Sequence, residues 1–404
     1  MLKNFLFALF AFTGTALPAQ VDLDSMYKQA KKSRDAELAR QTYRLALEMD
    51  SLEIAANSLY LSGWLYRKDH DYVNAVEFYL DASDLYRQLK KTVLLANVYE
   101  DIGAVFYYVL HYKNALQMYH KVLKLRKDHE KNGKYAQTLF NIGIVQRKLG
   151  VYDSAIYYYQ QAADYYQQND RHRPLLKVYN DMGLVMEIAE EFPIAGKYYM
   201  ETLELAKQQK DKFWESRALH NMGSIAIEQD QLDGALYYYN RALEVRATLD
   251  QPRLLMSTLN QIGHAYLRFD QLDSAFRYFT AALDHTEDAE EDLLMDNYLQ
   301  LSRLEEKKGN MSSALSHSRR YEEITQGLYA QQQALSEKRL FLEGKLVLEQ
   351  LKAREQAHVL RVRWYQWWTG SGAFGAVALV FILYFYFKAR ARKRVLASFA
   401  GRGL

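Results

Sequence analysis

The 404-residue chain contains no cysteine, so neither a disulfide framework nor thiol chemistry is available to it. Proline is almost as scarce, with only four residues, which leaves long stretches in which nothing interrupts a helix. Lysine and arginine outnumber aspartate and glutamate by only 52 to 49, a formal net charge of +3. Because nucleic-acid-binding proteins usually carry a strong basic excess, we expect no nucleic-acid partner.

The chain also lacks the motifs of the common catalytic and cofactor sites. Its ten histidines are scattered, and none forms HExxH or another metal-ligand spacing. No G-x-S-x-G elbow, phosphate-binding loop or kinase motif is present. One GxGxxG string, at Gly370, Gly372 and Gly375, follows no strand and has no acidic residue about 20 positions later. We therefore predict a protein that is not an enzyme and that holds no metal or cofactor.

What the chain has instead is an internal repeat with a 40-residue period. Six glycines recur at this interval, namely Gly63, Gly103, Gly143, Gly183, Gly223 and Gly263. Six alanines share the register 12 positions later, namely Ala75, Ala115, Ala155, Ala195, Ala235 and Ala275. A fixed period of about 20–50 residues indicates a solenoid or another array of repeats.

Each repeat unit has the pattern of two helices joined by a turn. Apolar residues recur at helical spacing in both halves of one unit, at Leu139, Ile142, Val145 and Leu149 and then at Ala155, Ile156, Tyr159 and Ala162. Between them, Gly150 is suited to end the first helix and Asp153 to cap the second. The small Gly143 and Ala155 would let the two backbones approach closely. Such a hairpin must stack on its neighbours to bury its apolar face.

The repeat resembles the tetratricopeptide repeat. It has a glycine, an alanine 12 positions later, an aromatic residue at 16 and a small residue at 19, as in Gly143, Ala155, Tyr159 and Ala162. The family's usual repeat has about 34 residues, so we expect the additional residues, about 6 per repeat, in longer helices. The resemblance implies an all-α solenoid of about seven to eight helix hairpins over residues 22–325.

The two ends of the chain have the composition of targeting and membrane segments. Residues 1–19 are typical of a secretory signal peptide, with one lysine ahead of an apolar run; an uncleaved anchor is the alternative. Residues 367–387 contain no charge over 21 positions, which is long enough for one transmembrane helix. The tail, 388–404, begins with a basic cluster typical of a stop-transfer segment, and anionic lipid would attract it. These features predict a single-pass protein of the bacterial inner (cytoplasmic) membrane, with periplasmic repeats and a cytoplasmic C-terminus.

Between the repeats and the predicted span, residues 326–366 predict a long connecting helix. They contain no proline and are rich in Leu, Glu, Lys, Arg and Gln. The helix could form a short coiled coil or rest on the last repeat. Small residues four apart in the span, such as Ser371 and Gly375, are typical of helix contacts in membranes. A homodimer through the long helix and the span is therefore one expectation.

The resemblance also implies where a ligand would bind. In tetratricopeptide proteins the first helices line a concave groove, and residues near the repeated glycine face it. The candidate peptide-binding residues are then Trp64, Arg67, Tyr107, Tyr108, Phe140, Arg147, Lys148, Asn180, His220, Asn260, His264 and Arg268. Aromatic side chains supply anchors and arginine supplies directional hydrogen bonds, so we expect a protein or peptide ligand. The family's clamp for acidic C-terminal peptides needs an asparagine just after the glycine, and no repeat has one there.

The order of segments resembles the receptor portion of bacterial membrane regulators, in which a histidine kinase or a helix-turn-helix domain follows the span. The segment after Phe387, 388–404, is too short for either domain. We predict a non-catalytic, membrane-anchored protein-interaction scaffold that presents its groove in the periplasm, in a sensory or signalling context. A chaperone-like or assembly tether for client polypeptides and a truncated receptor half of such a regulator are the alternatives.

Overall fold

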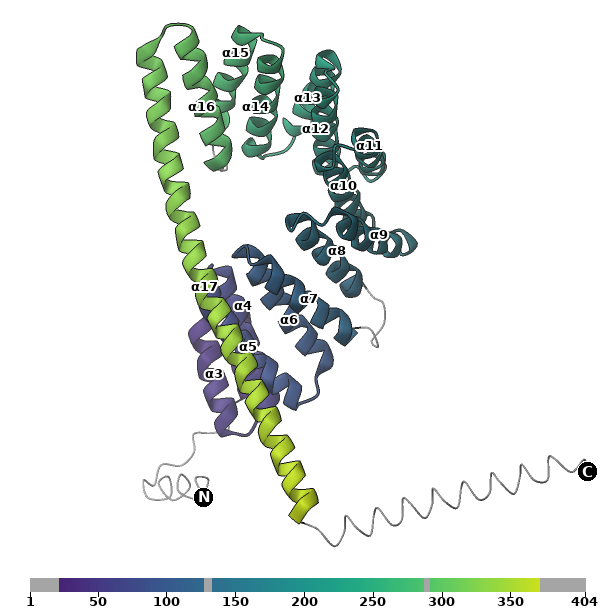
Figure 1. Ribbon diagram of the computed structural model, residues 1–404, viewed down its shortest axis with the longest axis vertical. Helices are drawn as coiled ribbons and strands as arrows, with labels where there is room; N and C mark the ends of the chain where they lie inside the picture. Colours follow the sequence, from purple (N-terminus) through teal and green to yellow (C-terminus); the bar gives the residue numbers. More distant parts are fainter. Residues whose placement is uncertain (1–21, 127–132, 287–290, 371–404) are drawn as a thin grey trace, which may run out of the picture. The chain divides into compact units, whose positions relative to one another are not determined.

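The computed structural model describes residues 22–126, 133–286 and 291–370, and within these ranges every regular element is a helix (Figure 1). The predicted signal peptide, 1–19, and the basic tail, 388–404, lie outside the described residues. The predicted span, 367–387, also lies outside them except for its first four residues. Of the helices that the structure does describe, none combines the length and the apolar character needed to cross a membrane.

The helices pair into eight hairpins in the described part of the chain. The first four pairs are α2 (Leu23–Ser33) with α3 (Ala36–Glu48), α4 (Leu52–Lys68) with α5 (Tyr72–Gln88), α6 (Thr92–Tyr108) with α7 (Tyr112–Arg126), and α8 (Gly133–Lys148) with α9 (Tyr152–Gln168). The others are α10 (His172–Ile188) with α11 (Phe192–Gln208), α12 (Lys212–Glu228) with α13 (Leu232–Arg246), α14 (Pro252–Arg268) with α15 (Leu272–Ala282), and α16 (Glu291–Lys307) with α17 (Met311–Gly370). A short 3-10 helix, η1 (Leu283–His285), follows α15. The predicted all-α array of hairpins is confirmed.

The 40-residue period comes from long helices and short turns. Helices α4, α5 and α6 each have 17 residues, and three residues separate one from the next. A repeat of about 34 residues must also contain two turns, so its helices must be shorter than these. The additional residues therefore lengthen the helices, as predicted.

The three-residue turns between helices share one backbone conformation. The second residue of each three-residue turn has a positive φ, at Asp50, His70, Lys90, Leu110, Gly150, Asp170, Glu190, Lys210, Asp230, Asp270 and Gly309. The residue after it closes the turn, as where the Asp71 N–H donates to the Tyr66 carbonyl at 2.9 Å. Gly150 thus ends α8 as predicted. The prediction for Asp153 is wrong, because Val151 is the N-cap residue of α9 and Asp153 lies within its first turn.

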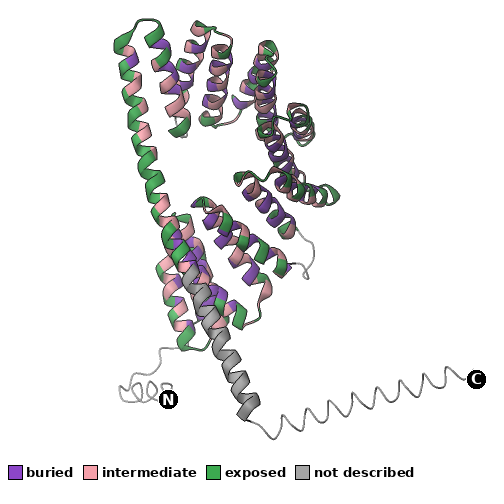
Figure 2. Cartoon of the chain, viewed as in Figure 1, coloured by how far each residue is buried: buried purple, intermediate pink, exposed green. Residues whose placement is uncertain are grey.

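The repeated glycines allow an aromatic ring to lie against the first helix of each hairpin. A Cβ atom added at Gly143 would lie 2.4 Å from Cε1 of Tyr159, a ring that is fully buried. The other five repeated glycines meet a ring in the same way, at Tyr79, Tyr119, Tyr199, Tyr239 and Phe279. The repeated alanines are also fully buried, and the buried residues lie where neighbouring helices face each other (Figure 2). The glycine, alanine and aromatic positions of the repeat are therefore packing positions.

The last helix differs from its prediction. We expected the final hairpin to end near residue 325 and a separate helix to cover 326–366. Instead, α17 runs without a break from Met311 to Gly370, since no proline interrupts it and Gly327 and Gly344 have open space around them. The chain divides into two compact units, Met1–Arg339 and Leu340–Leu404, and the site described below belongs entirely to the first.

Candidate functional site

The first helices of successive hairpins form one continuous surface, which we call the first-helix face: α4, α6, α8, α10, α12, α14 and α16. Neighbouring members of this set touch directly, as α10, α12 and α14 do. Side chains about one repeat apart in sequence therefore meet on it. The Tyr60 hydroxyl donates to Asp101 Oδ2 at 2.6 Å, and Asn221 Nδ2 donates to Asn180 Oδ1 at 2.9 Å. Hydrogen bonds of this kind link one repeat to the next.

Three of the twelve candidate binding residues are buried in these junctions. Phe140, Asn180 and Asn260 are each only 1–2% exposed. The ring of Phe140 packs against Tyr159, with centroids 5.4 Å apart. Asn260 accepts a hydrogen bond from Asn297 Nδ2 at 2.7 Å and donates to the Leu293 carbonyl at 3.2 Å. The structure thus places these three side chains in the packing between helices.

Three further candidates are engaged with acidic side chains. His264 Nε2 lies 2.5 Å from Asp296 Oδ2, and Arg268 Nη2 lies 2.9 Å from Asp230 Oδ1. Arg67 lies 3.8 Å from Asp101. Burial alone would raise the pKa of Asp296, but the hydrogen bond and charge of His264, together with the hydrogen bond from Gln300 and the charge of Arg303, lower it. These pairs reinforce the stacking of repeats.

The candidates Trp64, Tyr107, Tyr108, Arg147 and Lys148 are half-buried or exposed on the first-helix face. Tyr108 is 51% exposed, yet its ring stacks on that of Tyr72 at a centroid distance of 6.1 Å. Lys68 Nζ lies 4.8 Å from the centroid of the Trp64 ring. A stacked, accessible ring is a rigid surface for a ligand, because little side-chain entropy is lost on binding.

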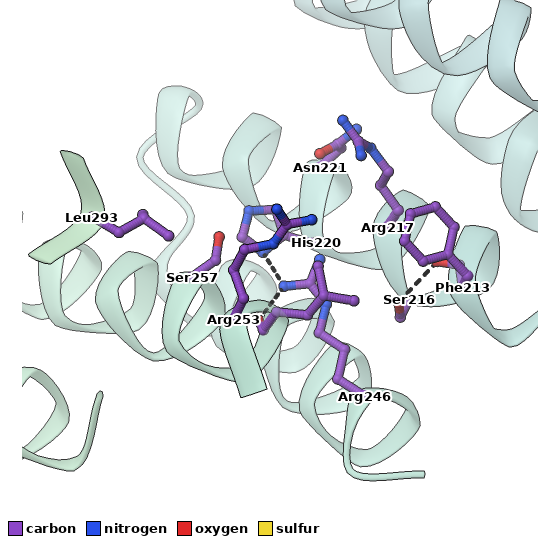
Figure 3. Close-up of a pocket in the computed structure, with 10 residues that line it drawn as sticks. Phe213, Ser216, Arg217, His220, Asn221, Arg246, Arg253, Ser257 and Leu293 are labelled. Atoms are coloured by element: carbon purple, nitrogen blue, oxygen red, sulfur yellow. Dashed lines mark hydrogen bonds between the residues drawn. The ribbon is translucent and has the colours of Figure 1, made fainter. Parts of the chain in front are cut away.

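The last candidate, His220, lines a cavity of about 230 Å³ on the same face. The lining residues come from α12, α13, α14 and α16 and are Phe213, Ser216, Arg217, His220, Asn221, Arg246, Arg253, Leu254, Ser257 and Leu293. Figure 3 shows Arg253 directed toward His220 and Arg246, with Arg217 and Asn221 on the other side. Among the described residues, the lining contains three arginines and no carboxylate.

The guanidinium of Arg246 is the most buried charge of this cavity. Arg246 is 3% exposed; its Nη1 donates to the Leu254 carbonyl at 2.7 Å and to Thr258 Oγ1. Its Nε is buried without a hydrogen-bond partner among the described residues. Burial, together with the charge of Arg217, lowers the pKa of Arg246 to about 9. The group is therefore still charged at neutral pH.

His220 lies beside that guanidinium as a neutral ring. Its Nδ1 is 3.3 Å from Arg246 Nη1. Burial, followed by the charges of Arg246 and Arg217, holds the pKa of His220 well below its ordinary value. The imidazole can then accept a hydrogen bond from the guanidinium but cannot neutralise it.

Sequence reasoning named His220 but not Arg246 or Arg253. Arg246 ends a second helix and Arg253 begins the next first helix, so neither lies near the repeated glycine. One feature of the sequence could have indicated the site. The pair Arg246 and Thr258 repeats the pair Arg126 and Thr138 of three repeats earlier.

A second cavity, of about 320 Å³, lies between α11, α12 and α13. Its lining is largely apolar and includes Phe192, Met200, Met222 and Ile225. It has no charged lining residue, in contrast to the arginine-lined cavity.

Comparison with known proteins agrees with the repeat architecture. The sequence model of the tetratricopeptide repeat matches residues 94–168 and 174–248, so the chain contains tetratricopeptide repeats. No curated protein matches the chain.

Several solved structures have a similar fold. The apo form of the quorum sensor NprR from B. thuringiensis is 13% identical, with a TM-score of 0.58 over 80% of this chain and 93% of that one. A signal transduction ATPase with a tetratricopeptide repeat sensor, PH0952 from Pyrococcus horikoshii, is 12% identical, with a TM-score of 0.56 over 83% of this chain and 54% of that one. The apo form of RapI is 12% identical, with a TM-score of 0.53 over 68% and 99%. At these identities the likeness concerns the fold alone.

Proposed function

We propose that this chain is a non-catalytic scaffold that binds a polypeptide segment on the first-helix face of its tetratricopeptide repeats. The observation that carries the proposal is the arginine-lined cavity, to which α12, α14 and α16 all contribute. A site that joins several repeats suits an extended ligand, because a solenoid presents its surface along its length. The accessible rings of Trp64 and Tyr108 on the same face would supply aromatic anchors.

A sensory context is part of the proposal. NprR is described as a quorum sensor, and PH0952 as a protein with a tetratricopeptide repeat sensor. The membrane anchor, the periplasmic repeats and the homodimer through residues 326–366 and 367–387 remain predictions from the sequence. Under this proposal, ligand binding outside the cytoplasm would be reported through the long helix to partners of the tail.

Selection of peptides tests the binding function. The full chain, purified in detergent, would be screened against a displayed library of random peptides. We expect selected peptides to bind the double variant Trp64→Ala/Tyr108→Ala about ten-fold or more weakly, since aromatic anchors carry much of the binding energy. The matched control is Tyr157→Ala/Tyr237→Ala, which removes two exposed rings, 62% and 57% exposed, from second helices. Equal binding to both double variants would contradict a site on the first-helix face.

Labelling of single cysteines tests the predicted topology, because the native chain has none. Lys210→Cys lies in the exposed turn between α11 and α12, and Ser398→Cys lies in the predicted cytoplasmic tail. In intact bacterial spheroplasts, we expect a membrane-impermeant maleimide to label Lys210→Cys at once and Ser398→Cys only after lysis. Labelling of Lys210→Cys only after lysis would place the repeats in the cytoplasm.

A further inference from the structure

Two repeats of this chain contain the same buried arginine motif. Arg126 ends α7, and Arg246 ends α13 three repeats later. Each is buried, at 6% and 3% exposure. Arg126 donates to the Lys134 carbonyl at 3.0 Å and to Thr138 Oγ1 at 2.7 Å. Arg246 makes the equivalent bonds to Leu254 and Thr258. The two guanidinium groups therefore have the same anchoring.

The two sites differ in what balances the positive charge. Arg126 Nη2 lies 2.6 Å from Glu100 Oε2 and donates to Asn97 Oδ1 at 3.0 Å. The positions three repeats after Glu100 and Asn97 are His220 and Arg217. Beside Arg246, the neutral imidazole of His220 thus replaces the carboxylate of Glu100. The cationic Arg217 replaces Asn97, whose amide oxygen accepts a hydrogen bond from Arg126.

This difference leaves the buried positive charge of the later repeat without a carboxylate in its cavity lining. A guanidinium in a protein interior is costly unless it is paired with an anion. None of the described residues that line the cavity is acidic. The guanidinium of Arg246 therefore keeps its positive charge in the cavity without an acidic residue among the described lining.

We propose that this cavity is a subsite for one oxyanion, a carboxylate or phosphate group of the bound polypeptide, in the place that Glu100 occupies beside Arg126. That the anion belongs to a bound polypeptide rests on the proposed scaffold function. That the cavity binds an anion rests on the comparison of the two repeats. The Nε of Arg246, which is buried without a hydrogen-bond partner among the described residues, is the donor on which this subsite rests. Arginine forks fit carboxylate and phosphate oxygens in pairs. Arg217, exposed at the rim, can turn inward to complete the set.

The volume and polarity of the cavity agree with such a ligand. A cavity of about 230 Å³ has room for a phosphate or a carboxylate with its first carbon atoms. Asn221 and Ser257 also line it and can donate hydrogen bonds to anion oxygens, whereas the Ser216 hydroxyl donates to the Phe213 carbonyl. Apolar contacts are supplied by Phe213, Leu254 and Leu293, against which the rest of an acidic side chain would pack.

The test exchanges the residue types at positions 100 and 220, which lie beside the two buried arginines. The full chain, purified in detergent, is used. The probe is inorganic phosphate, titrated against chloride at constant ionic strength and followed by calorimetry and by thermal unfolding. We expect the native chain to bind phosphate and its Tm to rise with phosphate. His220→Glu places a carboxylate beside Arg246, so it should raise the Tm in chloride and weaken phosphate binding by about ten-fold or more. Glu100→His should create a second phosphate site at Arg126.

Two further variants keep the test decisive if His220→Glu does not fold. Arg217→Gln changes an exposed side chain and should weaken phosphate binding while the helical circular dichroism is retained. Arg126→Met lies in the earlier repeat and should leave phosphate binding unchanged. The anion site is overturned if the native chain binds phosphate no better than chloride, or if folded His220→Glu and Arg217→Gln both bind it as the native chain does.

A competition experiment with peptides identifies the molecule that supplies the anion. A blocked peptide with a single aspartate should displace phosphate, and the same peptide with asparagine should not. If neither peptide displaces phosphate, the polypeptide source is wrong. The outcomes separate the two proposals, because loss of phosphate binding with library peptides still bound through Trp64 and Tyr108 would overturn only the anion subsite.

Discussion

Replacing Phe140 by alanine should lower the free energy of unfolding by about 3–5 kcal/mol, because the change removes a buried ring and leaves a cavity. Phe140 is 2% exposed and belongs to a core cluster that includes Leu139, Tyr159 and Met182. The loss should be local, since each repeat of a solenoid contacts only its neighbours. Urea unfolding with hydrogen exchange resolved for α8 and α9 would measure it.

Tyr157→Ala is the control for this prediction, because Tyr157 lies on α9 in the same hairpin and is 62% exposed. We expect its effect to stay within about 0.5 kcal/mol. If Phe140→Ala were no more destabilising than Tyr157→Ala, the Phe140 ring would be accessible, as a binding residue should be. Loss of ligand binding by a Phe140→Ala variant therefore says little about a binding site until its fold has been checked.

Gly143→Ala should lower the free energy of unfolding by about 1–3 kcal/mol, although the same change in an ordinary helix stabilises it by up to about 1 kcal/mol. The reversed sign follows from the packing of Tyr159, whose ring carbons would lie 2.4 and 2.5 Å from the new Cβ. The ring is fully buried and cannot move aside without displacing its neighbours. Paired urea unfolding curves would measure the difference.

Gly196→Ala provides the matched control. Gly196 also lies within a helix, α11, but a Cβ atom there would meet nothing within 4 Å. This variant should be stabilised by about 0.5–1 kcal/mol. A stabilising effect at both glycines would show that the close approach of Tyr159 to α8 does not occur. Adding Tyr159→Leu should relieve part of the cost of Gly143→Ala, which a double-mutant cycle would detect.

Most of the architecture follows from periodicity within the sequence. The recurrence of Gly143, Ala155 and Tyr159 with a 40-residue period predicts helix hairpins with a close helix contact, and the structure contains them. These positions could be recognised because a helix brings residues three and four apart onto one face. The same pattern repeated six times excludes coincidence.

The candidate site was harder to predict, because exposure on a first helix depends on the next hairpin. Phe140 and Tyr108 both occur near a repeated glycine, yet one is buried and the other is half exposed. What covers Phe140 is Tyr159 from the following helix, together with neighbours from the adjacent repeat. Helical spacing alone does not show which side chain the next repeat will place over a given position.

The sequence by itself determined the helix hairpins, their 40-residue period and the residues that pack inside each hairpin, because these depend on contacts within a single unit. Only the tertiary structure decided which residues remain available to a ligand. His220 and Arg246 belong to one hairpin, but stacking on the next hairpin places Thr258 Oγ1 3.4 Å from His220 Nδ1 and the Leu254 carbonyl 2.7 Å from Arg246 Nη1. The charge balance at this junction is set by the tertiary structure, because the free energy of a buried guanidinium depends on the charges near it in space and not on its neighbours in the chain.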